Sequence, residues 1–156
     1  MTFIIREVKK ADREEITKLA KTYVESLKEP FYEPLWFSLL ESYFLCLEIK
    51  DLEYKNLNIF CAEDTATKEL VGMLVAEIET DRLRRRYGRT SLWYVKRSAR
   101  GKKVGFELAQ KAHEYLKKNK VIYVDTNIRD DTPKALAISQ KLGFQKLYTR
   151  LRKYFF

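Results

Sequence analysis

A short basic stretch with two glycines, lying between two apolar segments, is the part of this sequence best suited to binding phosphate. It reads Arg100-Gly101-Lys102-Lys103-Val104-Gly105, follows the strand-like run S-L-W-Y-V, and opens a segment with helical spacing. A glycine-containing turn from strand to helix presents backbone N–H groups and the positive end of the helix dipole to phosphate. An ordinary charged turn has a similar composition, so the stretch alone leaves both interpretations open.

Few other side chains combine a suitable type with a suitable position for catalysis. Glu77 and Glu79 are two residues apart in a strand-like run, hence on one face, where a carboxylate could act as a base through water. Exposed strand-end carboxylates show the same pattern and are more common. Tyr94 could donate a hydrogen bond, although aromatic residues in strands usually pack. His113, the only histidine, is expected to be solvated in mid-helix.

The composition indicates one globular domain over residues 1–156. Hydrophobic residues make up 46% of the chain, which is enough to build a core without invoking disorder. The 31 Lys and Arg residues outnumber the 22 Asp and Glu residues and give a formal net charge of +9. Such a field attracts anionic partners, among them nucleotides, nucleic acid and phosphorylated cofactors.

Cysteine usage and hydropathy point to a reducing, aqueous compartment. Cys46 and Cys61 lie in apolar settings without metal-ligand spacing, so both are expected to be buried free thiols and no metal is expected. The N-terminal residues lack a signal-peptide pattern, and no apolar run is long enough to span a bilayer. We therefore expect a cytoplasmic protein with no membrane partner.

The chemically interesting residues are placed by alternating strand-like and helix-like segments. We expect strands at residues 2–8, 58–62, 69–79, 90–95, 121–126 and 144–156, with a basic loop at 81–89. We expect helices at residues 11–27, with Asp12 as candidate N-cap, at 35–49 after a break at 28–34, at 104–118, and at 132–142, with Pro133 at its first position and Gly143 after its end. This order predicts an α/β (α+β) fold with a mixed sheet.

This order of elements, together with three local motifs, resembles the GNAT superfamily of acyl-CoA-dependent N-acetyltransferases over nearly the whole chain. The pyrophosphate loop of that family has Gln or Arg, two residues, Gly, one residue, then Gly or Ala, and Arg100–Gly105 fits except at Lys103. Leu142-Gly143-Phe144 closes a helix as in the family, and Leu70–Leu74 is similar to its central strand. The resemblance implies one GNAT-like domain with a central mixed, mostly antiparallel twisted sheet flanked by helices.

The resemblance also implies a cosubstrate and the residues that hold it. Acetyl-CoA would place its pyrophosphate on the loop, and its pantetheine arm along the backbone of Tyr94 and Val95. Asn127 would stand across the opening, and Ser139 would lie in the cofactor region. The implied reaction is direct attack of a primary amine on the thioester, without a metal or a covalent enzyme intermediate. The partners are then acetyl-CoA and an amine acceptor, and the protein would be a monomer or homodimer.

Three positions depart from the family pattern. Leu92 stands where members often carry a Glu that serves as base, and Ser139 where many carry a Tyr that protonates the leaving sulfur. Lys103 replaces the central loop glycine, at a cost of roughly 1–2 kcal/mol if that position needs a positive φ. Its ammonium could offset this cost by contacting phosphate. Tyr94 and Glu77 remain as candidate catalytic residues.

Two other functions stay open. Because Leu92 and Ser139 replace the usual Glu and Tyr, the chain could also be a GNAT-like domain that binds acyl-CoA without catalysing transfer. A nucleic-acid-binding module would use the arginines of the basic loop, namely Arg82, Arg84, Arg85, Arg86 and Arg89. No recognised nucleic-acid motif accompanies them, so solvated loop charge is the expectation and nucleic acid is not an expected partner.

Overall fold

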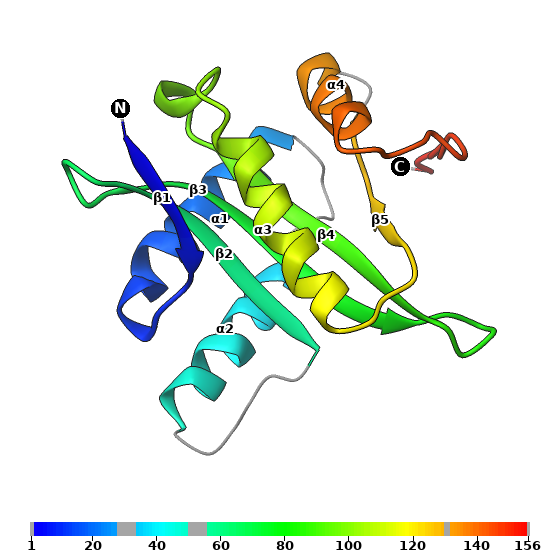
Figure 1. Cartoon of the computed structure of the whole chain (residues 1–156), viewed down its shortest axis with the longest axis horizontal. Coiled ribbons are helices and arrows are strands. Elements are labelled where there is room, and N and C mark those ends of the chain that lie inside the picture. The colour runs from blue at the N-terminus through cyan, green and yellow to red at the C-terminus, as the bar shows by residue number, and fades with distance from the viewer. Residues whose placement is uncertain (1, 28–33, 50–55, 130–131, 156) are drawn as a thin grey trace.

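Five strands form one sheet in the computed structural model of the chain, which describes residues 2–27, 34–49, 56–129 and 132–155. The strands are β1 (Phe3–Glu7), β2 (Leu57–Asp64), β3 (Leu70–Thr80), β4 (Arg86–Val95) and β5 (Val124–Thr126). They lie side by side in chain order, antiparallel except for the parallel pair β4 and β5 (Figure 1). The predicted mixed, mostly antiparallel sheet is confirmed.

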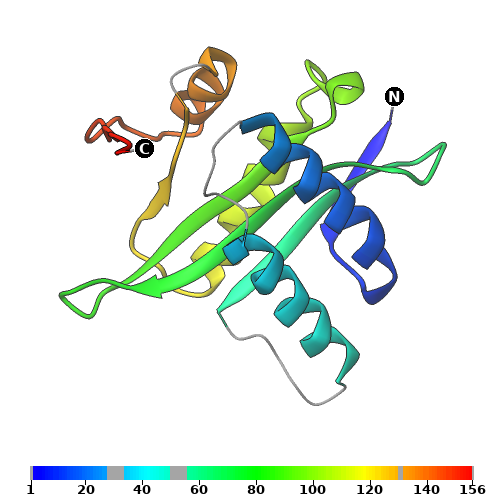
Figure 2. The same ribbon diagram turned by 180° about the vertical axis from the view of Figure 1, so that it is seen from behind.

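Helices cover both faces of this sheet. The α-helices are α1 (Arg13–Leu27), α2 (Pro34–Glu48), α3 (Val104–Lys118) and α4 (Pro133–Lys141), and the two short 3₁₀ turns are η1 (Lys10–Asp12) and η2 (Arg97–Ala99). Figure 1 shows α3 in front of the sheet, and Figure 2 shows α1 and α2 against the opposite face. Helix α3 begins and ends at the predicted residues.

The apolar run of β3 is buried on both faces, and this makes it the centre of the fold. Met73 and Val75 belong to the core beneath α1 and α2, whereas Leu74 and Ala76 belong to the core beneath α3. All four are fully buried. Burial of each large apolar side chain contributes about 1.5–3 kcal/mol, so both helical layers are held by the same central strand.

A bulge interrupts β4 two residues before its end. Met73 pairs with Tyr94 and Val75 pairs with Ser91, so two residues of β4, Leu92 and Trp93, lie opposite one residue of β3. Leu92 adopts a left-handed φ of 44° and its side chain is 2% exposed. The unfavourable backbone costs roughly 1–2 kcal/mol, which burial of the leucine side chain offsets. The bulge therefore changes the direction of the last residues of β4 while the Leu92 side chain stays in the core.

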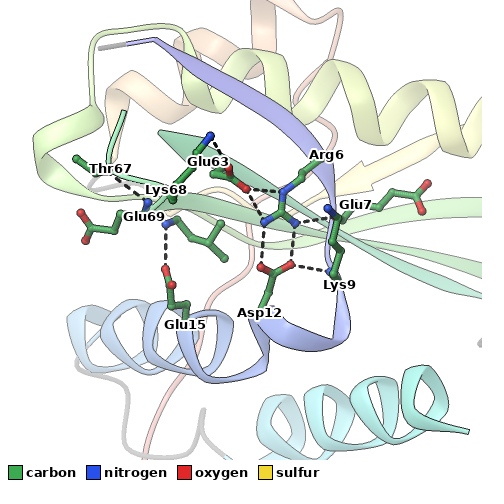
Figure 3. A network of polar contacts seen from close by, with 10 residues as sticks. Arg6, Glu7, Lys9, Asp12, Glu15, Glu63, Thr67, Lys68 and Glu69 are labelled. Carbon is green, nitrogen blue, oxygen red and sulfur yellow. Dashed lines mark hydrogen bonds and ion pairs between the residues drawn. The ribbon is translucent and has the colours of Figure 1, made fainter. Parts of the chain in front are cut away.

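An ion network fastens the first strand to its neighbours (Figure 3). The Arg6 guanidinium donates to both carboxylate oxygens of Asp12, at 2.7 and 2.9 Å, and to Glu63 at 2.7 Å. Burial alone would raise the pKa of Asp12, but hydrogen bonds from Arg6 and from the Lys9 N–H lower it overall. Asp12 thus stabilises the turn η1 by accepting the Lys9 N–H at 2.6 Å.

Several predicted boundaries were wrong in informative ways. The basic loop is shorter than expected, because Arg86–Arg89 already belong to β4, whereas β5 covers only Val124–Thr126 of the predicted strand 121–126. The run 144–155 is not a strand, and most of its side chains are exposed. Strand-forming side chains need a neighbouring strand to supply hydrogen-bond partners, and the three-residue β5 offers little edge.

Three smaller predictions met different outcomes. Cys61 is buried, as predicted, whereas Cys46 is only half-buried because it lies on the partly exposed side of α2. The predicted break at 28–34 lies outside the described residues except for Pro34, which opens α2. No described helix is both long and apolar enough to cross a lipid bilayer.

Candidate functional site

Strands β4 and β5 diverge halfway along β4. They pair only at Gly88 with Val124, Arg89 with Asp125 and Thr90 with Thr126. From Ser91 to Val95, β4 has no neighbouring strand on that side among the described residues. Its backbone there is an open edge, which can pair with an extended ligand as a further strand would.

The basic turn that follows β4 is shaped as an anion-binding loop. Gly101 has φ 78° and Lys103 has φ 64°, and α3 starts at the next residue. The N–H groups of Gly101, Lys103, Val104 and Gly105 donate to no group in the described part of the chain. Unpaired N–H groups at a helix start carry a partial positive charge, so this turn can receive phosphate oxygens.

Lys103 adopts the left-handed conformation that was expected to be costly for a residue other than glycine. Its side chain is exposed, and it makes no side-chain capping bond at the start of α3. A lysine in this conformation costs roughly 1–2 kcal/mol relative to glycine. The backbone shape of the glycine-containing loop is therefore preserved by a residue that also adds a positive charge.

Gly105 brings the start of α3 close to β4. A Cβ atom there would lie 3.4 Å from Nε1 of Trp93 and 3.5 Å from Cγ2 of Val95. Trp93 donates its indole N–H to the Gly105 carbonyl at 3.0 Å. These are ordinary contact distances, so a methyl group would fit, and the Trp93 hydrogen bond is what ties the start of α3 to β4.

Arg100 links the turn back to the open edge. Its Nε donates to the Val95 carbonyl at 3.0 Å, and its guanidinium carbon lies 5.9 Å from the centre of the Tyr94 ring. The Tyr94 ring in turn packs 5.9 Å from the ring of Tyr23 on α1. Tyr94 is half-buried on the α1 side of the sheet, so its side chain contributes packing. The Lys96 N–H donates to the Val71 carbonyl on β3, and backbone groups alternate sides along a strand, so those of Tyr94 face β3 and those of Val95 face the open edge.

A polar cluster lies on the β3 and β4 strands. Glu77 is half-buried, and its nearest polar partner is the Ser91 hydroxyl, which donates at 3.4 Å. Burial raises the pKa of Glu77, a change that Arg89 partly opposes and Glu79 reinforces. Arg89 donates to Glu79 at 2.7 Å, and the Tyr87 hydroxyl also donates to Glu79. Within the described residues Glu77 has no ion-pair partner, unlike Glu79.

Two further predicted residues are placed unfavourably for catalysis. Ser139 is 2% exposed, and its hydroxyl donates to the Ala135 carbonyl one turn earlier in α4 at 2.9 Å. It is therefore occupied within its own helix. Leu92, at the position of the common family base, is part of the core beneath α1 and α2.

Asn127 follows β5 directly and is exposed, at the end of the strand that diverges from β4.

The prediction that His113 is solvated was wrong. It is half-buried, with its ring centre 5.4 Å from that of Phe144 and its Nε2 buried without a partner among the described residues. Burial and the nearby Lys117 lower its pKa.

Ser91 and Trp93 were not recognised as site residues from the sequence. Ser91 becomes the partner of Glu77 and Trp93 the anchor of α3 only because the bulge at Leu92 resets which residues face which side. A buried leucine between polar and aromatic residues gives no local signal of a bulge. Among the described residues, no cluster of His, Cys, Asp or Glu side chains has an arrangement that could hold a metal ion.

Comparison with known proteins agrees with this geometry. The model of the Acetyltransferase (GNAT) family matches residues 18–144. A search of curated proteins finds no match. Among solved structures, a glucosamine-6-phosphate N-acetyltransferase from Arabidopsis thaliana is similar, with TM-score 0.73 and 17% identity over 99% of both chains.

Two further solved structures share the fold. A transcriptional regulator from Bacillus halodurans C-125 has a TM-score of 0.73 and 24% identity over 99% of this chain and 100% of its own. A ribosomal-protein-alanine N-acetyltransferase from Brucella melitensis biovar Abortus 2308 has a TM-score of 0.69 and 15% identity over 99% of both chains. At these identities the likeness concerns the fold alone.

Proposed function

Because the chain belongs to the GNAT acetyltransferase family, we propose that it transfers an acetyl group from acetyl-CoA to a primary amine, such as a protein N-terminus, a lysine or a small amine. The observation that carries this proposal is the junction of two features. The open edge of β4 ends at Val95, and a basic turn with unpaired N–H groups begins five residues later at Arg100. A ligand with an extended amide arm and a pyrophosphate fits that junction.

The cosubstrate would be held by backbone more than by side chains. The N–H groups of Gly101, Lys103, Val104 and Gly105 suit the pyrophosphate, with Arg100 and Lys102 adding positive charge. The Val95 N–H, which faces the open edge, suits a carbonyl of the pantetheine arm, and Tyr94 lies beside it. Asn127 would border the opposite side of the opening. When bound, acetyl-CoA supplies an activated acetyl group as a thioester.

The amine must lose a proton before it attacks, and Glu77 is our candidate to receive it through water. Its half-buried carboxylate with a raised pKa is a better base than an ordinary surface glutamate. The bulge at Leu92 leaves a residue outside the regular ladder, and a backbone N–H there suits the developing oxyanion. We assign Tyr94 a positioning role, through Tyr23 and Arg100. No residue is assigned as the acid for the leaving thiolate.

The runner-up function is acyl-CoA binding without transfer. It is favoured by the burial of Leu92 and by the internal hydrogen bond of Ser139, which leave the usual base and acid positions inert. The two functions separate in one experiment. The protein is incubated with acetyl-CoA and an acceptor panel of peptides, lysine derivatives, polyamines and small amines, and coenzyme A binding is measured in parallel. Saturable binding with acetylation of at least one acceptor supports transfer, and binding alone supports the runner-up. If the protein neither binds coenzyme A nor acetylates any acceptor, both functions are overturned.

A further inference from the structure

The turn between β3 and β4 projects beyond the body of the sheet (Figure 1). The carboxylate of Asp81 holds this turn in one shape. Asp81 accepts hydrogen bonds from the N–H groups of Leu83 and Arg85 at 2.8 and 3.0 Å. It also accepts from Nε of Arg85 at 2.8 Å and from the Tyr123 hydroxyl at 3.2 Å. Its own carbonyl accepts the Arg84 N–H at 2.9 Å. The turn is therefore an ordered feature.

Three arginines at this turn keep their charge available. Arg85 is paired with Asp81 and Arg89 with Glu79, so the local carboxylates are already used. Arg82, Arg84 and Arg86 are exposed and form no ion pair with any residue in the described ranges. Arg84 sits at the tip with φ 60°, a conformation that arginine adopts at a cost. An ordered turn thus presents three unpaired guanidinium groups.

The end of α3 adds positive charge beside this turn. The Ile122 N–H donates to the Arg86 carbonyl at 3.1 Å, so the segment that leaves α3 lies against the start of β4. Three exposed lysines come just before it, at Lys117, Lys118 and Lys120. Both the turn and the end of α3 therefore contribute cations at one end of the molecule.

We propose that this surface, the β3–β4 turn with the end of α3, binds the phosphate backbone of duplex DNA. Guanidinium groups match phosphate geometry, and a net charge of +9 draws a polyanion toward the protein. The arginines stand on a projecting turn, whereas sites for small anions are concave. A two-stranded ribbon fits the major groove of B-form DNA, and the major groove of A-form RNA is too narrow for it.

The composition of the tip disfavours a lipid surface. Leu83, 72% exposed, is the one large apolar side chain on the described turn 81–86, and stable membrane contact needs a broader apolar face. The sequence alone favours solvated loop charge, because it shows neither the order of the turn nor which arginines are paired. The DNA inference is independent of acetyl transfer, since the binding is measured without acetyl-CoA.

The test is fluorescence anisotropy with a labelled duplex of roughly 20 base pairs, titrated at several salt concentrations. The triple variant Arg82→Gln, Arg84→Gln, Arg86→Gln should bind at least about tenfold more weakly, and its salt slope should fall by about 2–3. The matched control Lys10→Gln, Lys21→Gln, Lys141→Gln removes the same charge from exposed positions elsewhere and should change affinity by less than about threefold. Thermal midpoints of both variants should match that of the unaltered protein.

A second variant separates an ordered surface from bulk charge. Asp81→Ala raises the net charge by one but removes the carboxylate that orders the turn. A surface that depends on order predicts weaker DNA binding by this variant, whereas bulk attraction predicts tighter binding. Equal losses in the two triple variants, tighter binding by Asp81→Ala, tighter binding of duplex or single-stranded RNA, or no saturable DNA binding would each overturn the inference.

Discussion

Nε of Arg100 donates a hydrogen bond to the carbonyl of Val95 at 3.0 Å, so the first residue of the basic turn is tied to the last residue of the open strand edge. This bond connects the two parts of the proposed coenzyme A site. One holds phosphate through N–H groups and charge, and the other pairs with an extended arm. Their relative position decides whether one ligand can use both.

Replacing Arg100 should therefore weaken cosubstrate binding more than loss of one charge explains. We expect Arg100→Ala to raise the Kd for coenzyme A by about tenfold, equivalent to about 1.4 kcal/mol, by isothermal titration calorimetry. Arg97→Ala is the control, because Arg97 is exposed on η2 and carries the same charge. Equal losses in the two variants would mean that the bond to Val95 has no part in binding.

Glu77→Gln tests the proposed base. The substitution should lower the single-turnover acetylation rate by about 10²-fold or more, with coenzyme A affinity intact. Burial raises the pKa of Glu77, so the rate of the unaltered protein should rise with pH as this carboxyl ionises, and the variant should lose that rise. Glu79→Gln, whose carboxylate is paired with Arg89, should cost less than about tenfold. A Glu77→Gln rate within threefold of normal would remove Glu77 from the chemistry.

Ser139 is expected to be dispensable for the reaction. Its buried hydroxyl is bonded to the Ala135 carbonyl, and the thiolate leaving group needs little protonation near neutral pH because a thiol has a pKa of about 8.5. Ser139→Ala should thus lower the rate at saturating acetyl-CoA by less than about tenfold, or about 1.4 kcal/mol of transition-state stabilisation. A thousandfold drop with normal coenzyme A affinity would show that Ser139 takes part.

His113 should make the fold sensitive to mild acid. Burial and the charge of Lys117 lower its pKa below the ordinary value of about 6.5, and the ring packs against Phe144. Between the two pKa values the unfolded chain binds a proton that the folded chain does not, so stability falls as pH drops below about 6.5. His113→Leu should lose this part of the pH dependence when thermal midpoints are compared at about pH 7.5 and about pH 5.5. An identical decline in both proteins would assign the effect to other groups.

The sequence was sufficient for features that depend on local chemistry. Helix α3 was predicted to its residue boundaries because its apolar spacing is regular and the basic turn precedes it. Gly143 and Lys103 both have a positive φ. This could be expected because Gly143 directly follows a helix and Lys103 stands at the glycine position of the loop before a helix. These features need no knowledge of a distant neighbour.

Features that depend on strand pairing could not be predicted in this way. The early start of β4 could not be predicted because Arg86 and Arg89 are charged residues, which are typical of loops. They belong to a strand because β3 lies alongside and its Glu79 pairs with Arg89. The bulge at Leu92 exists because of its register with Leu74 and its neighbours, so the partner Ser91 could not be recognised. The run 144–155 has strand-forming side chains, but pairing is what makes a strand, and its side chains are largely exposed.

Amide hydrogen exchange with and without coenzyme A tests the central claim most directly, because that claim concerns named N–H groups. Saturating coenzyme A should slow exchange at Gly101, Lys103, Val104 and Gly105 and at Val95 on the open edge, since bound phosphate and pantetheine take up these donors. The turn between β2 and β3 at 65–69 serves as an internal reference and should not change. Unchanged exchange in the turn 101–105 under saturating ligand, or protection confined to another part of the chain, would contradict the proposed site.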